Sequence, residues 1–278
     1  MQRSEIRTAL VTGATDGVGR VVAERLGAAG LRVLVHGRDR ERGEGVVHDI
    51  RQAGGEAEFI AADLASLAQV RGLAASVADK ADRLDLLINN AGIGSGGTGA
   101  VRQESADGNE LRFAVNYLAG FLLTRMLLPS LRNNAPARIV NVASAGQQAI
   151  DFDDVMLTGG YSGSRAYCQS KLAQILFTVD LAEELDGAGV TANALHPATY
   201  MNTTMVRQAG VTPWSTVEQG ADAILNLATS PALAGRSGLY FDGLREARAQ
   251  AQAYDRDARA RLRTLSFALT GLADPARR

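Results

Sequence analysis

Short apolar runs alternate with longer amphipathic stretches along the 278 residues of the chain. Most of the apolar runs are nearly continuous, which is typical of parallel strands covered on both faces. These runs predict strands at residues 8–12, 31–36, 58–62, 84–89, 138–143, 190–196 and 238–241. The amphipathic stretches predict helices at residues 18–29, 40–53, 68–79, 109–131, 164–184, 216–228 and 255–269. The alternation predicts an α/β fold, a single domain over residues 1–278 with a doubly wound parallel sheet of about seven strands flanked by helices.

Three segments interrupt this alternation, at residues 94–108, 146–163 and 199–213. Each follows a predicted strand end, so we expect all three to gather at the carboxyl edge of the sheet, where open α/β sheets bind ligands. We interpret them as substrate loops. Their apolar residues favour a hydrophobic ligand; they are Ile150, Phe152, Val155, Met156, Met201, Met205 and Trp214.

A glycine-rich loop lies between the first strand and the first helix. Glycine lets the backbone turn tightly and approach a pyrophosphate closely, and a helix start offers free N–H groups and a positive dipole end. A turn without a ligand is the alternative, which the strand before and the helix after disfavour. The loop therefore predicts a Rossmann-like dinucleotide site. Its predicted contacts are Gly13, Thr15, Asp16, Gly17, Val18 and Gly19.

The end of the second strand indicates which nucleotide binds. A carboxylate there would hold the ribose 2′-hydroxyl of NAD, but this strand ends in Gly37, followed by Arg38. A guanidinium forms charge-assisted bonds to a 2′-phosphate. NADP(H) is therefore preferred, with NAD(H) as the alternative. Asp16 argues for the alternative because its charge lies near that phosphate, and a solvated surface arginine is the other interpretation of Arg38.

Residues after the third and fourth strands complete the predicted cofactor site. Asp63 has a side chain that can bond an adenine amino group, although it is also a candidate N-cap for the next helix. Small residues after the fourth strand would let the cofactor lie close, and an amide there can tie loops together. These predicted contacts are Asp63, Leu64, Asn90, Ala91 and Gly92.

Tyr167 and Lys171 are the strongest candidates for chemistry. They lie four residues apart in a predicted helix and therefore share one face. An ammonium one turn from a phenol lowers the pKa of that phenol. An acid/base tyrosine beside a dinucleotide cradle indicates hydride transfer, whereas an ordinary helix-surface pair is the alternative.

Taken together, these motifs resemble the short-chain dehydrogenase/reductase family. Residues 12–19 match its glycine motif, residues 89–92 its Asn-Asn-Ala-Gly motif and Tyr167-x-x-x-Lys171 its active-site motif. Ser144 and Asn116 match the remaining two catalytic positions. The chain is most similar to the retinol dehydrogenase and carbonyl reductase-like members, on residues 166–177, the long interval from 144 to 167 and residues 237–241. Such members prefer NADP.

The resemblance implies a role for each of four residues. Tyr167 would exchange a proton with the carbonyl or alcohol oxygen, and Ser144 would bond that oxygen. Lys171 would hold the nicotinamide ribose and stabilise the phenolate; a pKa lowered by about 3 units needs about 4 kcal/mol. Asn116 would position a water that passes protons onward from Lys171.

One segment departs from the family pattern. After the sixth strand the family has Pro-Gly, whereas this chain has Pro197-Ala198. The predicted cofactor contacts in this segment are Pro197 and Thr199, with Asn202 and Thr203 next.

Composition and charge limit the kinds of partner that the protein could bind. The formal net charge is −1 and no basic stripe stands out, which disfavours nucleic acid. The single cysteine, Cys168, excludes an intrachain disulfide and fits a reducing compartment. The sequence has no Cys/His cluster that would suggest a metal site. Because Arg125 and Pro129 interrupt the most apolar helix, we expect no membrane span. The apolar run at residues 8–12 is too short for a signal peptide core, so we also expect no targeting segment and a cytoplasmic location.

The sequence thus predicts an NADPH-dependent oxidoreductase that moves a hydride between nicotinamide and a carbonyl or alcohol. A related epimerase or dehydratase with retained cofactor, and a nucleotide sensor without turnover, are the alternatives. The resemblance also implies a homodimer or homotetramer. The substrate's identity is left open.

Overall fold

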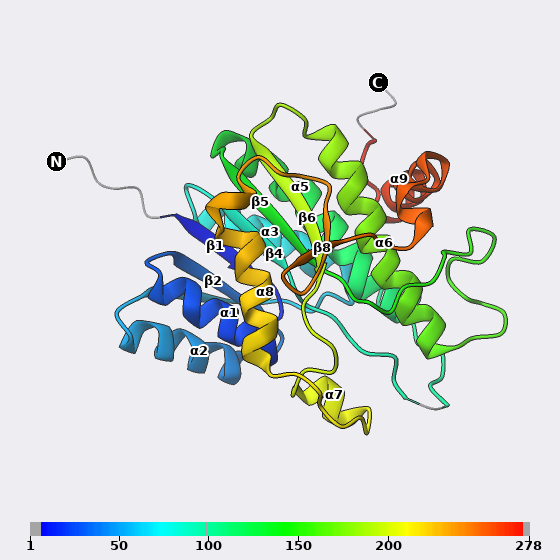
Figure 1. Ribbon diagram of the computed structural model, residues 1–278, viewed down its shortest axis with the longest axis horizontal. Helices are drawn as coiled ribbons and strands as arrows, with labels where there is room; N and C mark the ends of the chain where they lie inside the picture. Colours follow the sequence, from blue (N-terminus) through cyan, green and yellow to red (C-terminus); the bar gives the residue numbers. More distant parts are fainter. Residues whose placement is uncertain (1–6, 98, 275–278) are drawn as a thin grey trace.

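The sheet runs through the centre of the molecule (Figure 1). The computed structural model describes residues 7–97 and 99–274. Within these residues the sheet has eight strands in the order β3-β2-β1-β4-β5-β6-β7-β8, and β8 alone runs antiparallel to its neighbour. The strands are β1 Thr8–Val11, β2 Arg32–Gly37, β3 Glu56–Ala61, β4 Leu86–Asn89, β5 Ala137–Val142, β6 Val190–His196, β7 Tyr240–Asp242 and β8 Arg245–Ala247.

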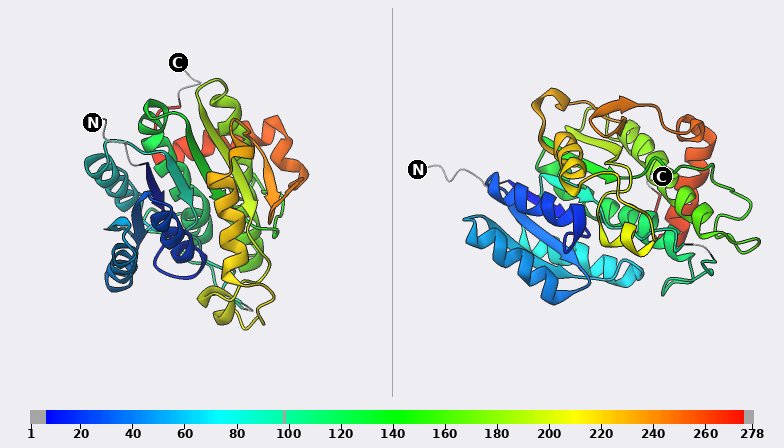
Figure 2. Two further views of the ribbon diagram at one scale, coloured as in Figure 1. Left: turned by 60° about the vertical axis from the view of Figure 1, so that its left-hand side comes forward. Right: turned by 60° about the horizontal axis from the view of Figure 1, so that its bottom comes forward.

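Two layers of helices cover the two faces of this sheet. Apolar residues of α1, α2 and α8 form one core with one face, and those of α3, α5, α6 and α9 form a larger core with the other. Figure 2 shows α9 at the opposite end of the molecule from α1 and α2. The α-helices are α1 Gly17–Ala28, α2 Arg40–Gln52, α3 Leu67–Lys80, α4 Leu111–Phe113, α5 Ala119–Asn133, α6 Gly163–Glu184, α7 Thr204–Gln208, α8 Val217–Thr229 and α9 Arg256–Thr270. The other helical segments are the π-helix η1 Ala114–Leu118 and the 3-10 turns η2 Pro231–Leu233 and η3 Ala251–Tyr254.

The predicted fold class is confirmed, and the seven predicted strands are present. The eighth strand and helix α7 were not predicted. Both are short, three and five residues, so neither contains enough residues for a hydrophobic period to show. β8 returns beside β7 through a tight turn at Gly243, whose φ is +58°.

The predicted helix at 109–131 is instead three consecutive segments, α4, η1 and α5. Pro129 does not end it, because α5 continues through the proline to Asn133. Proline removes one backbone hydrogen bond, and burial of Leu127, Leu128 and Leu131 offsets that loss. By length and composition residues 111–133 could cross a membrane, but 72% of the apolar window is buried inside the protein, as in a core helix.

The strand order reverses between β1 and β4, and the site forms at this point. β1 pairs with β2 on one side and with β4 on the other. In open α/β sheets such a reversal leaves a crevice at the carboxyl ends of the strands. The glycine loop after β1 and the residues after β4 meet there.

Candidate active site

Each glycine of the loop after β1 occupies a place that a side chain could not. A Cβ on Gly13 would lie 2.7 Å from Ala91 Cα, and one on Gly19 would lie 2.2 Å from the Gly13 carbonyl oxygen. Gly13 and Gly17 also have φ angles of +64° and +55°. A Cβ on Gly17 would lie 3.2 Å from Thr203 Cγ2. The loop thus has the close approaches and left-handed backbone that a phosphate cradle requires.

Asn90 fixes this loop from the neighbouring strand. Its side-chain amide donates to the carbonyl oxygens of Thr12, at 2.9 Å, and of Gly13, at 3.1 Å. The Thr12 hydroxyl accepts in return from the backbone N–H groups of Asn90 and Ala91. The amide therefore ties the two loops together, as its residue type suggested.

His36 supports the same loop, and sequence reasoning missed this role. Its Nδ1 accepts from Gly13 N–H at 3.3 Å, and its Nε2 lies 3.1 Å from the Ala62 carbonyl oxygen, to which it donates in this tautomer. Burial lowers the pKa of His36 to about 4, so the ring is neutral at physiological pH. A histidine at the end of an apolar strand was the one available signal.

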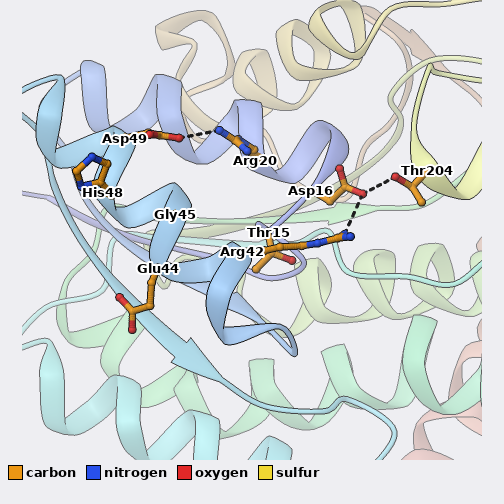
Figure 3. A pocket seen from close by; sticks show the side chains of 9 residues that line it. All are labelled: Thr15, Asp16, Arg20, Arg42, Glu44, Gly45, His48, Asp49 and Thr204. Carbon is orange, nitrogen blue, oxygen red and sulfur yellow. Dashed lines mark hydrogen bonds and ion pairs between the residues drawn. The ribbon is translucent and has the colours of Figure 1, made fainter.

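A cleft of about 530 Å³ lies between α1 and α2, beside the glycine loop (Figure 3). Asp16 caps α1, accepting from Gly17 N–H at 2.7 Å, and also accepts from the Thr204 hydroxyl at 2.6 Å. The Thr204 hydrogen bond, followed by the backbone bond, holds the pKa of Asp16 below its usual value. Arg42 points at Asp16 from α2, with its Nη1 3.9 Å from Asp16 Oδ2 (Figure 3). Arg42 lies in the first turn of α2, four residues after Arg38, and sequence reasoning missed it.

Arg38 projects from the end of β2 with 70% of its side chain exposed, and its Nη1 lies 4.0 Å from Asp63 Oδ2. Most of the Arg38 side chain is therefore open to solvent beside this long ion pair. Asp63 is not the N-cap of α3, because that cap is Ser66. The other Asp63 oxygen accepts from Ala65 N–H at 3.0 Å.

The position that an NAD-binding carboxylate would take is filled by another side chain. A Cβ on Gly37 would lie 2.3 Å from Thr15 Cγ2. Leu64 and Val18, two further predicted contacts, are buried at 7% and 8% exposure and pack in the two cores.

Lys171 is buried in α6 beneath the end of β5. Its ammonium donates to the Val142 carbonyl oxygen at 2.9 Å and to Gln174 Oε1 at 3.0 Å. Burial lowers the pKa of Lys171 to about 7. Its Nζ lies 5.9 Å from the centre of the Tyr167 ring.

Tyr167 and Ser144 share the space over Gly146. A Cβ on Gly146 would lie 3.5 Å from Ser144 Oγ and 3.6 Å from Tyr167 Cε1. Burial raises the pKa of Tyr167, and a hydrogen bond with Ser144 opposes this shift in part. The protein groups alone therefore favour the neutral phenol, whereas the Tyr-Lys spacing had suggested a lowered pKa. Burial also raises the pKa of the adjacent Cys168 thiol, which fits a packed rather than a reactive cysteine.

Asn116 lies in the π-helix η1, a type of helix that is frequent at functional sites. Its side chain donates to the Ile93 carbonyl oxygen and the Ser170 hydroxyl, and accepts from Ile93 N–H at 2.7 Å. A Cβ on Gly92 would lie 3.3 Å from both Asn116 Oδ1 and Lys171 Nζ. The structure thus brings Asn116 and Lys171 to the same glycine.

The segment after β6 forms a lid that reaches back to the glycine loop. Pro197 is buried, and the exposed Thr199 bonds His196 Nε2 through its hydroxyl at 3.1 Å. Met205 stands over Gly94, where a Cβ would lie 3.2 Å from its Cγ. Trp214 is 75% exposed, and its ring meets the Tyr200 ring edge-to-face.

The other apolar loop residues differ from expectation. Ile150 is buried, and Phe152, Val155 and Met156 pack partly buried against the larger core. Among the apolar residues assigned to substrate contact, these four therefore belong at least in part to the core.

A buried ion pair that sequence reasoning missed joins two of the predicted substrate loops. Arg112 donates to the carbonyl oxygens of Gly94 and Ser95, at 2.9 and 2.8 Å, and to the Tyr161 hydroxyl at 2.6 Å. That hydroxyl in turn donates to Glu110, whose carboxylate lies 3.6 Å from Arg112. Across residues 7–97 and 99–274, no group of three or more His, Cys, Asp or Glu is placed to hold a metal ion.

The fold and this site define a dinucleotide-dependent oxidoreductase of the doubly wound class. A family model for short chain dehydrogenase matches residues 7–213, and the chain belongs to that family. It is 38% identical to retinol dehydrogenase 13 of Homo sapiens, over 97% of this chain and 86% of that protein.

Two solved structures are also similar to this chain in fold and in sequence. An uncharacterized protein of Mycobacterium paratuberculosis has a TM-score of 0.80 and 31% identity, with 97% of this chain and 95% of that chain covered. The RhlG/NADP active-site complex of Pseudomonas aeruginosa has a TM-score of 0.69 and 31% identity, with 85% and 94% covered. The chain is thus an oxidoreductase that acts on CH–OH groups, similar to retinol dehydrogenases.

Proposed function

We propose that this protein is an NADP(H)-dependent reductase that interconverts an apolar carbonyl compound and its alcohol. The observation that carries the proposal is the convergence of four side chains beside the crevice. Ser144 and Tyr167 meet over Gly146, and Lys171 and Asn116 meet at Gly92.

Each of these residues has a definite task in the proposed reaction. The nicotinamide supplies or accepts the hydride when it is bound. Tyr167 donates its phenolic proton to the carbonyl oxygen during reduction, or accepts the alcohol proton during oxidation. Ser144 donates to the same oxygen and stabilises its developing negative charge. Lys171 has three N–H donors, of which two hold Val142 and Gln174, so one remains for the ribose.

The proposed proton path continues at Asn116. A cavity of about 10 Å³ lies against Asn116 and Gln174, with Thr12 and Asn89 among its other neighbours. This is about the smallest space that holds one water molecule. Its position supports the role of Asn116 in guiding a water.

Tyr167→Phe tests the reaction itself. We expect this variant to lose at least a hundredfold in kcat with NADPH, because general acid catalysis contributes about 10²–10⁴. Tyr254→Phe removes a phenol outside the site and should keep wild-type turnover. Full turnover of Tyr167→Phe would refute the assignment. Turnover without net oxidation of NADPH would favour an epimerase, and nucleotide binding without any turnover would favour a sensor.

Two arginines support the preference for the 2′-phosphate. Arg38 is exposed at the end of β2, and Arg42 lies in the cleft beside Asp16. We expect Arg38→Gln to lower the ratio of kcat/KM for NADPH to that for NADH by about tenfold or more. Arg40→Gln is the matched control, since that exposed arginine pairs with Glu44. An unchanged ratio in Arg38→Gln would place the phosphate elsewhere.

The exposed apolar side chains of the lid support an apolar substrate. Tyr200, Met205 and Trp214 all lie in this segment. Because relatives are named retinol dehydrogenases, we propose aldehydes with long apolar chains, retinaldehyde among them. A panel of such aldehydes and short polar ketones with NADPH tests this, and equal kcat/KM for both groups would refute it. A cytoplasmic location and a dimer or tetramer stay predictions.

A further inference from the structure

The ammonium of Lys171 is held by protein oxygens on two sides. The Val142 carbonyl oxygen accepts at the end of β5, and Gln174 Oε1 accepts from one turn further along α6. Gln174 is itself 4% exposed, and its backbone carbonyl oxygen accepts from the Thr178 hydroxyl at 2.7 Å. The amide therefore reaches Lys171 from a buried position.

We propose that Gln174 is a positioning residue for the reaction, because its side-chain oxygen holds the ammonium of Lys171 in place and favours its charged form. The inference rests on the proposed function only where Lys171 acts on Tyr167. The contact itself is a property of the folded protein.

An amide suits this task better than the other acceptors. A buried ammonium needs hydrogen-bond acceptors, since burial favours its neutral form. A carboxylate at residue 174 would supply one, but its negative charge would cancel the field of Lys171 at Tyr167. The glutamine oxygen supplies the hydrogen bond and adds no net charge. Gln174 thus supports the ammonium without weakening its effect on the phenol.

Among the described residues, few charged or titratable groups influence Lys171. Burial is the cause of its lowered pKa. Tyr167 faces it from the same helix, with the ring centre 5.9 Å away. His196 faces it from β6; burial lowers the pKa of that histidine, Asp242 opposes the shift, and the charge of Lys171 adds to it. Gln174 is therefore the side chain whose loss should change the titration of Lys171 most directly.

The sequence offers a clean measurement, because Lys80 and Lys171 are its two lysines. In protein labelled with ¹³C at lysine Cε, an NMR titration would follow two signals, and Lys80→Arg would assign them. Lys80 pairs with Glu58 at 2.8 Å near the surface and serves as an internal reference. We expect Gln174→Leu to lower the pKa of Lys171 by about one unit and leave Lys80 unchanged.

Gln169→Leu is the matched control. Gln169 is also buried in α6, but within the described part of the chain its amide has no hydrogen-bond partner. We expect the pKa of Lys171 to be the same in this variant as in the wild type. If Gln174→Leu does not fold, Gln174→Met keeps a long flexible side chain without a strong acceptor and takes its place.

A second measurement is the pH dependence of turnover. In alcohol oxidation, the pH at which kcat/KM reaches half its plateau should rise by about one unit in Gln174→Leu, a tenfold loss on that limb. Circular dichroism and thermal denaturation would record stability separately. A folded Gln174→Leu protein with wild-type pKa of Lys171 and an unmoved limb would overturn the inference. If the wild type shows no turnover, the proposed function fails, and the NMR titration alone decides the role of Gln174.

Discussion

Replacing Lys171 by methionine should raise the free energy of unfolding, and this gain should decrease as the pH rises. The side chain is 5% exposed, and burial lowers its pKa from 10.5 to about 7. Each unit of pKa corresponds to about 1.4 kcal/mol, so the charged form is disfavoured in the folded protein by about 5 kcal/mol. Methionine fills a similar volume without a charge. The hydrogen bonds that Lys171 makes to Val142 and Gln174 are lost, which offsets part of the gain.

The direction of this change with pH follows from the number of protons that the folded and unfolded states bind. Between pH 7 and 10.5 the unfolded chain keeps the proton of Lys171 while the folded protein releases it, so the stability of the wild type rises with pH. Below pH 7 both states are protonated and the full cost is present. Lys171→Met lacks this titration. The advantage of the variant in the free energy of unfolding should therefore shrink by about 2 kcal/mol from pH 7 to pH 9.

Urea denaturation of both proteins at pH 6, 7, 8 and 9, followed by circular dichroism, measures this difference. Comparing the two proteins at each pH removes the titrations that they share. Lys80→Met is the control, because that lysine lies near the surface and its difference from wild type should be nearly constant over this range. A constant difference for Lys171→Met would mean that Lys171 stays protonated, and the argument from burial would be wrong.

Two further predictions concern the cofactor loop. Gly13→Ala should abolish NADPH binding and lower the free energy of unfolding by about 2 kcal/mol or more, because a methyl group would collide with the backbone after β4 at a positive φ. The control is Gly45→Ala, in open space on α2, which should be neutral or stabilising by up to about 1 kcal/mol. Equal effects of the two variants in urea denaturation would contradict this prediction. Thr204→Val removes the hydrogen bond to Asp16 and should raise the dissociation constant of NADPH about tenfold. Fluorescence of Trp214, the single tryptophan, would report that binding, and an unchanged constant would show that the lid contact is unimportant.

The sequence predicted the sheet well because parallel strands carry their own signal. A run that is buried on both faces is apolar at almost every position, as in Thr8–Val11 and Leu86–Asn89. Neither β8 nor α7 has this signal. Residues 245–247 become a strand only because the turn at Gly243 returns the chain beside β7.

The four candidate catalytic residues were equally accessible from the sequence, since each belongs to a local motif with a fixed place on a strand or helix. The contacts that organise them were not. Thr204 and Asp16 are 188 residues apart, and His36 on β2 bonds Gly13, which follows the neighbouring strand β1. Such pairs are set by the strand order of the sheet, and no short pattern in the sequence encodes them.

The Tyr167–Lys171 pair shows most clearly what spacing leaves out. Four residues along a helix place two side chains on one face, and from that alone an ammonium should lower the pKa of the phenol. In the folded protein Lys171 is buried and Tyr167 is partly buried, and this loss of water raises the pKa of Tyr167 and lowers that of Lys171 to about 7. Burial thus favours the neutral form of each partner, and the charge that the chemistry needs on Lys171 depends on the acceptors around it. The sequence identifies the two candidate groups, but it does not show that the Val142 and Gln174 oxygens bond Lys171 in the folded protein.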